Sequence, residues 1–142
     1  MIGGQVVDVS ASGKNITEDI LSFIYELKTG ALLESAMMIG AILAGAEEEE
    51  VAVIEQVAKK IGIAFQIQDD ILDVTSTEEV LGKPVFSDQK NEKTTYVTLF
   101  GLEKAKKDVE QISEEAIALL RSLQRENAYL EQLLQELIHR EK

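Results

Sequence analysis

Three aspartates, Asp69, Asp70 and Asp73, lie close together in the middle of the chain, with Gln66 just before them. At about 100° per residue, a helix places these four side chains within one face roughly 100° wide. Apolar residues border that face on both sides, so we expect the carboxylates to be partly buried. Like charges packed in this way repel, and burial makes ionisation costlier, unless cations neutralise them. Hard oxygen donors without Cys or His favour Mg²⁺, Mn²⁺ or Ca²⁺ over zinc.

The segment after the aspartates brings positive charge to the same region. Lys83 and Lys93 lie in a polar stretch that also contains the only proline of the chain, Pro84. Either lysine would be able to contact a phosphate whose other oxygens are bound to metal ions. A second interpretation stays open at this point, in which the acidic strip faces water or pairs with lysine and the loop lysines are solvated.

Helical periodicity dominates the chain and supplies the elements that must position these residues. The aspartates lie near the end of a predicted long helix, residues 51–74, in which apolar side chains repeat at three- and four-residue steps. Residues 75–93 are predicted to be an irregular segment. Upstream, a helix is predicted over residues 17–27, capped by Thr17 or Asn15, and a second over residues 31–44, after a kink at Lys28-Thr29-Gly30. Downstream, one helix is predicted over residues 102–123. A last helix is capped by Asn127 and reaches Ile138. The prediction is an all-α fold and a single unit over residues 1–142.

Composition and charge exclude several classes of function. The chain has 142 residues, no Cys and a formal net charge of −12. Such a charge argues against binding to nucleic acid or to an anionic membrane surface, since both need a basic protein surface. Without Cys, the chain has no disulfide, no thiolate zinc site and no Cys nucleophile. No window is long and apolar enough for a membrane span, and we predict a cytoplasmic location.

Five short motifs together resemble one enzyme family. They occur in family order over the stretch from Gly3 to about Leu99, and the similarity is to the C-terminal half of a trans-isoprenyl diphosphate synthase, of the polyprenyl synthetase family. Each motif is weak alone, whereas the ordered set is specific. The motifs are Gly3-Gly4-Gln5 with Asp8, Lys28-Thr29-Gly30, Phe65-Gln66 with Asp69, Asp70 and Asp73, Gly82-Lys83, and Ser87-Asp88 with Lys93-Thr94-Thr95-Tyr96.

The resemblance implies a fold, a reaction and a set of roles. It implies the C-terminal half of an isoprenoid-synthase helical bundle, and a prenyltransferase that condenses an allylic diphosphate with isopentenyl diphosphate. Mg²⁺ is the implied cofactor, with Mn²⁺ as the alternative. The implied metal ligands are Asp69, Asp70 and Asp73. The implied diphosphate-binding residues are Lys28, Lys83 and Lys93. The Thr29 carbonyl and the Gln66 amide are implied to direct their dipoles at the allylic carbocation.

The sequence also departs from the family pattern. The first Asp-rich motif of the family lies upstream of the Gly-Gly-Gln region, and this chain has neither a second Asp-rich cluster nor any Arg before Arg121. We therefore expect the isolated chain to be inactive, and to form a homo-oligomer, such as a dimer, or to pair with the missing N-terminal half. The alternative is a non-catalytic partner subunit of a heteromeric prenyl synthase.

Overall fold

The computed structural model of the chain describes residues 2–11, 16–81 and 94–138, with side chains up to residue 75 in the middle range. Every regular element in these ranges is a helix, so the all-α prediction is confirmed. The elements are α1 (Ile2–Ala11), α2 (Glu18–Tyr25), the π-helical turn η1 (Glu26–Gly30), α3 (Ala31–Leu43), α4 (Glu48–Leu81), α5 (Tyr96–Phe100), α6 (Leu102–Arg121) and α7 (Ala128–Ile138).

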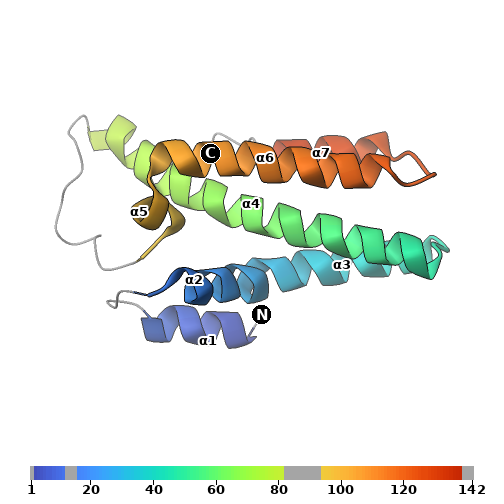
Figure 1. Cartoon of the computed structure of the whole chain (residues 1–142), viewed down its shortest axis with the longest axis horizontal. Coiled ribbons are helices and arrows are strands. Elements are labelled where there is room, and N and C mark those ends of the chain that lie inside the picture. Colours follow the sequence, from blue (N-terminus) through green and yellow to red (C-terminus); the bar gives the residue numbers. More distant parts are fainter. Residues whose placement is uncertain (1, 12–15, 82–93, 139–142) are drawn as a thin grey trace.

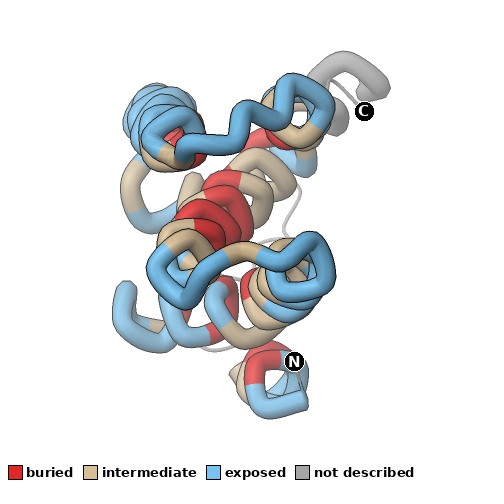
Figure 2. Tube along the Cα trace, turned by 90° about the vertical axis from the view of Figure 1, so that its right-hand side faces the viewer, coloured by how far each residue is buried: buried red, intermediate tan, exposed pale blue. Residues whose placement is uncertain are grey.

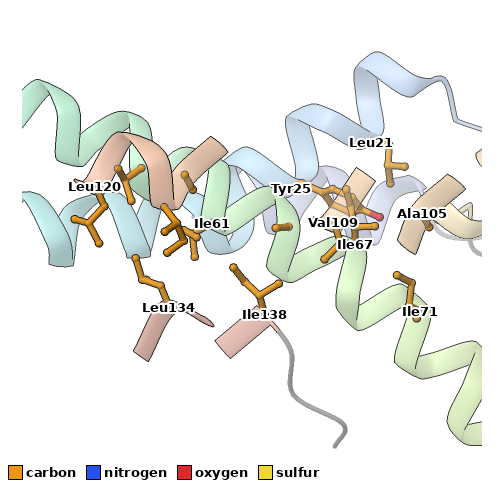
Figure 3. Packing of buried hydrophobic residues seen from close by; sticks show 14 of the residues in the cluster. Leu21, Tyr25, Ile61, Ile67, Ile71, Ala105, Val109, Leu120, Leu134 and Ile138 are labelled. Atoms are coloured by element: carbon orange, nitrogen blue, oxygen red, sulfur yellow. The ribbon is translucent and has the colours of Figure 1, made fainter. Parts of the chain in front are cut away.

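Helix α4 is the central element of the bundle. Figure 1 shows α6 and α7 on one side of it and α2, η1 and α3 on the other, with α1 outside α2. Buried residues follow α4 through the middle of the molecule, whereas the outer helices are largely exposed (Figure 2). The core consists mainly of aliphatic side chains, among them Ile61 and Ile67 of α4 with Leu120 and Leu134 from α6 and α7 (Figure 3).

The long predicted helix is longer in the structure. It begins at Glu48, within the acidic run that favours a helix start, and continues to Leu81. Residues 75–81 are therefore helical, and the predicted irregular segment over 75–93 is wrong in its first part. The physical reason is that residues 75–81 contain no Gly or Pro, and the Thr75 hydroxyl donates to the Ile71 carbonyl at 2.9 Å within the helix. Residues 82–93 lie outside the described residues.

Helix caps and boundaries agree in part with the prediction. The Asn127 side chain accepts a hydrogen bond from the Leu130 backbone N–H at 2.9 Å, which confirms it as a cap. Thr17 occupies the N-cap position of α2 without a side-chain cap hydrogen bond, so its predicted capping contact is absent, and Asn15 lies outside the described residues. Periodicity did not predict α1 or the short α5. Among the described residues, no helix combines the length and the apolar character that a membrane crossing requires.

Candidate active site

The Lys28-Thr29-Gly30 motif lies in the π-helical turn, at the point where the sequence predicted a kink. The turn joins α2 to α3 without a break, and the Ala31 backbone N–H reaches back five residues to the Glu26 carbonyl. A π-helical turn changes the face on which the following side chains emerge, and such turns are frequent at functional sites. The chain stays helical through this motif, and the irregularity that the sequence predicted takes the form of a π-helical turn.

Two glycines allow the backbone of this turn to be approached from both sides. A Cβ on Gly4 of α1 would lie 2.7 Å from the backbone of Leu27 and Lys28. A Cβ on Gly62 of α4 would lie 2.8 Å from the Cα of Gly30. Both distances are below van der Waals contact, and both involve backbone atoms that cannot turn aside. The turn is therefore held between α1 and α4 at positions where only glycine fits.

Lys28 is held by an ion pair with α1. Its Nζ lies 2.7 Å from Oδ2 of Asp8, a carboxylate that is buried even though the apolar Val6 and Val9 on the same helix are exposed. A buried charge is costly unless it is paired, so the two side chains fix each other's positions. Asp8 follows Gly4 by four residues, one helical turn, and the same face of α1 thus provides both the close approach and the counter-charge.

Gln66 and Thr29 are in direct contact. The Gln66 Nε2 donates to the Thr29 Oγ1 at 2.9 Å, which joins α4 to the π-helical turn. The sequence-based roles referred to the Thr29 carbonyl and the Gln66 amide dipole. The structure adds that the Thr29 hydroxyl fixes the orientation of that amide.

Asp70 joins three helices. Its Oδ2 accepts hydrogen bonds from the Tyr25 hydroxyl of α2 and, at 2.7 Å, from the Tyr96 backbone N–H at the start of α5. Burial, reinforced by the negative charge of Asp70, raises the pKa of Tyr25 far above its ordinary value, so the phenol stays protonated and remains a donor. One face of α4 thus contacts η1 and then α2 through three residues spaced four apart. We call these residues, Gly62, Gln66 and Asp70, the polar stripe of α4.

The other two aspartates of the motif flank the stripe. Asp69 is half-buried, and Asp73, one helical turn further, is exposed. Among the described residues, no group of three or more acidic or histidine side chains forms a ready-made metal cage. Mg²⁺ commonly takes one or two carboxylates and completes its shell with water and substrate phosphate, so the donor chemistry of Asp69, Asp70 and Asp73 fits this ion.

The structure thus gathers several of the predicted site residues at one place. Lys28, Gln66 and Asp70 line one cavity of about 30 Å³, together with Asp8 and Tyr25. This cavity is far too small for a diphosphate, so its lining shows only that these side chains converge. Lys83 and Lys93 lie outside the described residues.

Two contributors had no assigned role in the sequence-based interpretation. Asp8 was noted only as part of a motif, and Tyr25 was not noted at all. A signal for Tyr25 exists: it shares the buried face of α2 with Leu21 and Ile24, and a phenol at an apolar-stripe position needs a hydrogen-bond partner. The identity of that partner, 45 residues away, depends on the tertiary fold.

Comparisons with known proteins place these features in a family context. The model of the polyprenyl synthetase family matches residues 1–137. A geranylgeranyl diphosphate synthase of Cyanophora paradoxa is 48% identical over 117 residues, which are 82% of this chain and 39% of that protein.

Solved structures of this kind resemble the whole described fold. An FPP/GFPP synthase from Zymomonas mobilis superposes with a TM-score of 0.80 and 29% identity, covering 96% of this chain and 45% of that one. A geranyltransferase from Helicobacter pylori, solved with magnesium and isoprenyl diphosphate, superposes with a TM-score of 0.71 and 31% identity, covering 97% of this chain and 44% of that one. The chain therefore spans less than half the length of these relatives.

Proposed function

Because the chain belongs to the polyprenyl synthetase family, we propose that it forms one wall of the active site of an isoprenyl diphosphate synthase. The reaction would be the Mg²⁺-dependent condensation of an allylic diphosphate with isopentenyl diphosphate. The proposal rests above all on one observation: residues from three separate motifs, Lys28, Gln66 and Asp70, line the same small cavity. The relatives are named farnesyl and geranylgeranyl diphosphate synthases, which are prenyltransferases.

Each residue of this wall would have a distinct task. Lys28, oriented by Asp8, would bind the diphosphate of the allylic substrate, together with Lys83 and Lys93. Gln66 and Thr29 would direct carbonyl dipoles at the allylic carbocation without offering a nucleophile that traps it. Bound Mg²⁺ would supply positive charge to the departing diphosphate.

The proposed metal ligands are Asp69, Asp70 and Asp73, and the ion is supported by the magnesium in the Helicobacter pylori geranyltransferase. In the synthase that contains this chain, Asp69→Ala should lower kcat by orders of magnitude, because a metal-bound oxygen is lost. Glu49→Ala, an exposed acidic position in the first turn of α4, is the matched control and should leave kcat unchanged. Near-normal turnover of Asp69→Ala would contradict the metal assignment.

A second candidate function is that of a non-catalytic partner subunit, and the outer helices favour an association of some kind. α3 is composed largely of apolar residues, yet none of them is buried, and α1 exposes Ile2, Val6 and Val9. Uncovered apolar faces of this kind mark interaction surfaces. Homo-oligomerisation, such as a dimer, or pairing with an N-terminal half would cover them. Sedimentation of this chain as a monodisperse monomer at micromolar concentration would contradict homo-oligomerisation.

The coding sequence upstream of the Met1 codon separates the two candidates. An open frame that encodes a further Asp-rich motif followed by arginines would assign this chain to a complete synthase. A stop codon with a ribosome-binding site would favour the partner subunit. The single-unit organisation of residues 1–142 and the cytoplasmic location remain predictions.

A further inference from the structure

Tyr25 is buried where α2, α4 and α5 meet. Only 6% of its surface is exposed, and in Figure 3 its side chain lies among core residues of α4 and α6. The ring fills apolar space, whereas the hydroxyl contacts two polar groups that are far away in the sequence. The hydroxyl donates to Oδ2 of Asp70 and accepts a hydrogen bond from the Tyr96 backbone N–H at 3.2 Å.

These three groups form a closed triangle. The Tyr96 N–H also donates to the same Asp70 oxygen, at 2.7 Å, so Oδ2 accepts hydrogen bonds from two neighbouring donors. A carboxylate held by two donors at one oxygen has little freedom to rotate about its terminal torsion. Tyr25 and the start of α5 therefore both constrain the direction in which Asp70 presents its carboxyl group.

We propose that Tyr25 is a positioning residue for the Asp-rich motif: its hydroxyl orients Asp70 and holds the start of α5 against α4. The inference rests on the proposed function and deepens it, because it concerns how the same site is kept ready for metal and diphosphate. Tyr25 acts through Asp70 and contacts no substrate.

The test is Tyr25→Phe in the synthase that contains this chain. Phenylalanine keeps the ring in the core and removes only the hydroxyl, so the fold should be retained. Tyr129→Phe is the matched control, since Tyr129 is 77% exposed on α7. The readouts are Mn²⁺ binding measured by electron paramagnetic resonance without substrate, and the Mg²⁺ concentration that gives half-maximal rate.

We expect Tyr25→Phe to weaken Mn²⁺ binding and to raise the half-maximal Mg²⁺ concentration by about tenfold, the lower end of what outer-shell partners of metal ligands contribute. Tyr129→Phe should change neither. If the hydroxyl were merely structural, its removal would lower Tm and leave the metal dependence unchanged at temperatures where both variants are folded. That result would overturn the inference. So would a wild-type protein that binds no Mn²⁺.

A second variant shows whether the effect passes through Asp70. In an Asp70→Asn background, removal of the Tyr25 hydroxyl should cause no further loss of Mn²⁺ binding, because the group that it orients has already changed. A further tenfold loss would contradict the route through Asp70. If Asp69→Ala abolishes turnover while Tyr25→Phe behaves like Tyr129→Phe, this inference fails and the proposed function stands.

Discussion

The two sides of α4 are packed by different means. Toward α6 and α7, its buried residues are aliphatic, such as Ile61, Ile67 and Ile71, and they interdigitate with similar side chains (Figure 3). On the polar stripe, the contacts are instead made with specific groups: Gly62 meets Gly30, Gln66 meets Thr29, and Asp70 meets Tyr25 and the Tyr96 backbone N–H.

The difference separates stability from geometry. Aliphatic packing contributes in proportion to the area buried and tolerates substitutions that conserve volume. The polar stripe depends on individual atoms, since a single missing hydroxyl or an added methyl group changes where a site residue lies. Mutations on the apolar side should therefore lower stability alone, whereas mutations at the polar stripe and at its neighbours should also displace site residues.

The largest expected effect tests the apolar side. Leu134→Ala should lower the free energy of unfolding by about 2–5 kcal/mol, because Leu134 is 2% exposed and its truncation leaves a cavity in the core. Urea unfolding measures this loss of stability. The neighbouring Leu133, 44% exposed, is the control, and Leu133→Ala should cost less than about 1 kcal/mol. Equal losses would contradict the assignment of α7 to the core.

The second prediction adds one methyl group to the polar stripe. Gly62→Ala should destabilise the protein by about 1–3 kcal/mol, because the new Cβ would overlap the backbone of Gly30 and push η1 away from α4. Gly40→Ala is the control. Nothing lies within 4 Å of its Cβ position in the interior of α3, so this change should stabilise the helix by about 0.5–1 kcal/mol. In thermal unfolding, Tm should fall for Gly62→Ala and rise for Gly40→Ala. A change of Tm in the same direction for both variants would contradict the close contact between Gly62 and Gly30.

The apolar side of α4 could be predicted from sequence, and the contacts of the polar stripe could not. Helical periodicity is a local property, so it identified α4, α6 and α7 and the side of α4 that carries the aspartates. It missed α1, because two glycines near its start weaken the local preference and because its apolar residues are exposed while Asp8 is buried.

The candidate site was identified by motif order, and its internal contacts needed the fold. Lys28, Gln66 and Asp70 were selected from the sequence, yet their partners are separated from them by 20, 37 and 45 residues. Neither spacing nor residue type determines which hydroxyl meets Asp70 or which carboxylate pairs with Lys28. Tyr25 went unnoticed for this reason.

The third prediction concerns the ion pair behind the site. Asp8→Asn should lower the free energy of unfolding by about 1–2 kcal/mol, since Lys28 would keep its charge in a half-buried position with only a neutral partner. It should also raise KM for the allylic diphosphate in the synthase, because Lys28 loses the group that orients it.

The control for this pair is Glu55→Gln. Glu55 and Lys59 form an i,i+4 ion pair on the exposed face of α4, and such a pair contributes little. Both variants are compared by urea unfolding and by the KM for the allylic diphosphate. If Glu55→Gln had the larger effect on KM, Asp8 would have no special role at the site.

The smallest expected effect tests charged contacts away from the stripe. The Lys104 ammonium, hydrogen-bonded to Asp108, holds the pKa of that carboxyl below its usual range. A lowered pKa in the folded state means that the contribution of Asp108 to stability is complete above its unfolded pKa, near pH 4, and is lost as the pH falls through the lowered value. The stability difference between wild type and Asp108→Asn should therefore shrink as the pH falls below about 4. Glu103→Gln, at an exposed pair with Lys106, should show almost no pH-dependent difference. Urea unfolding at each pH measures both, and a difference that grows on acidification would reverse the assigned sign. A small effect at Asp108 beside a clear effect at Asp8 would mean that burial, rather than charge pairing in general, makes the Lys28–Asp8 contact matter.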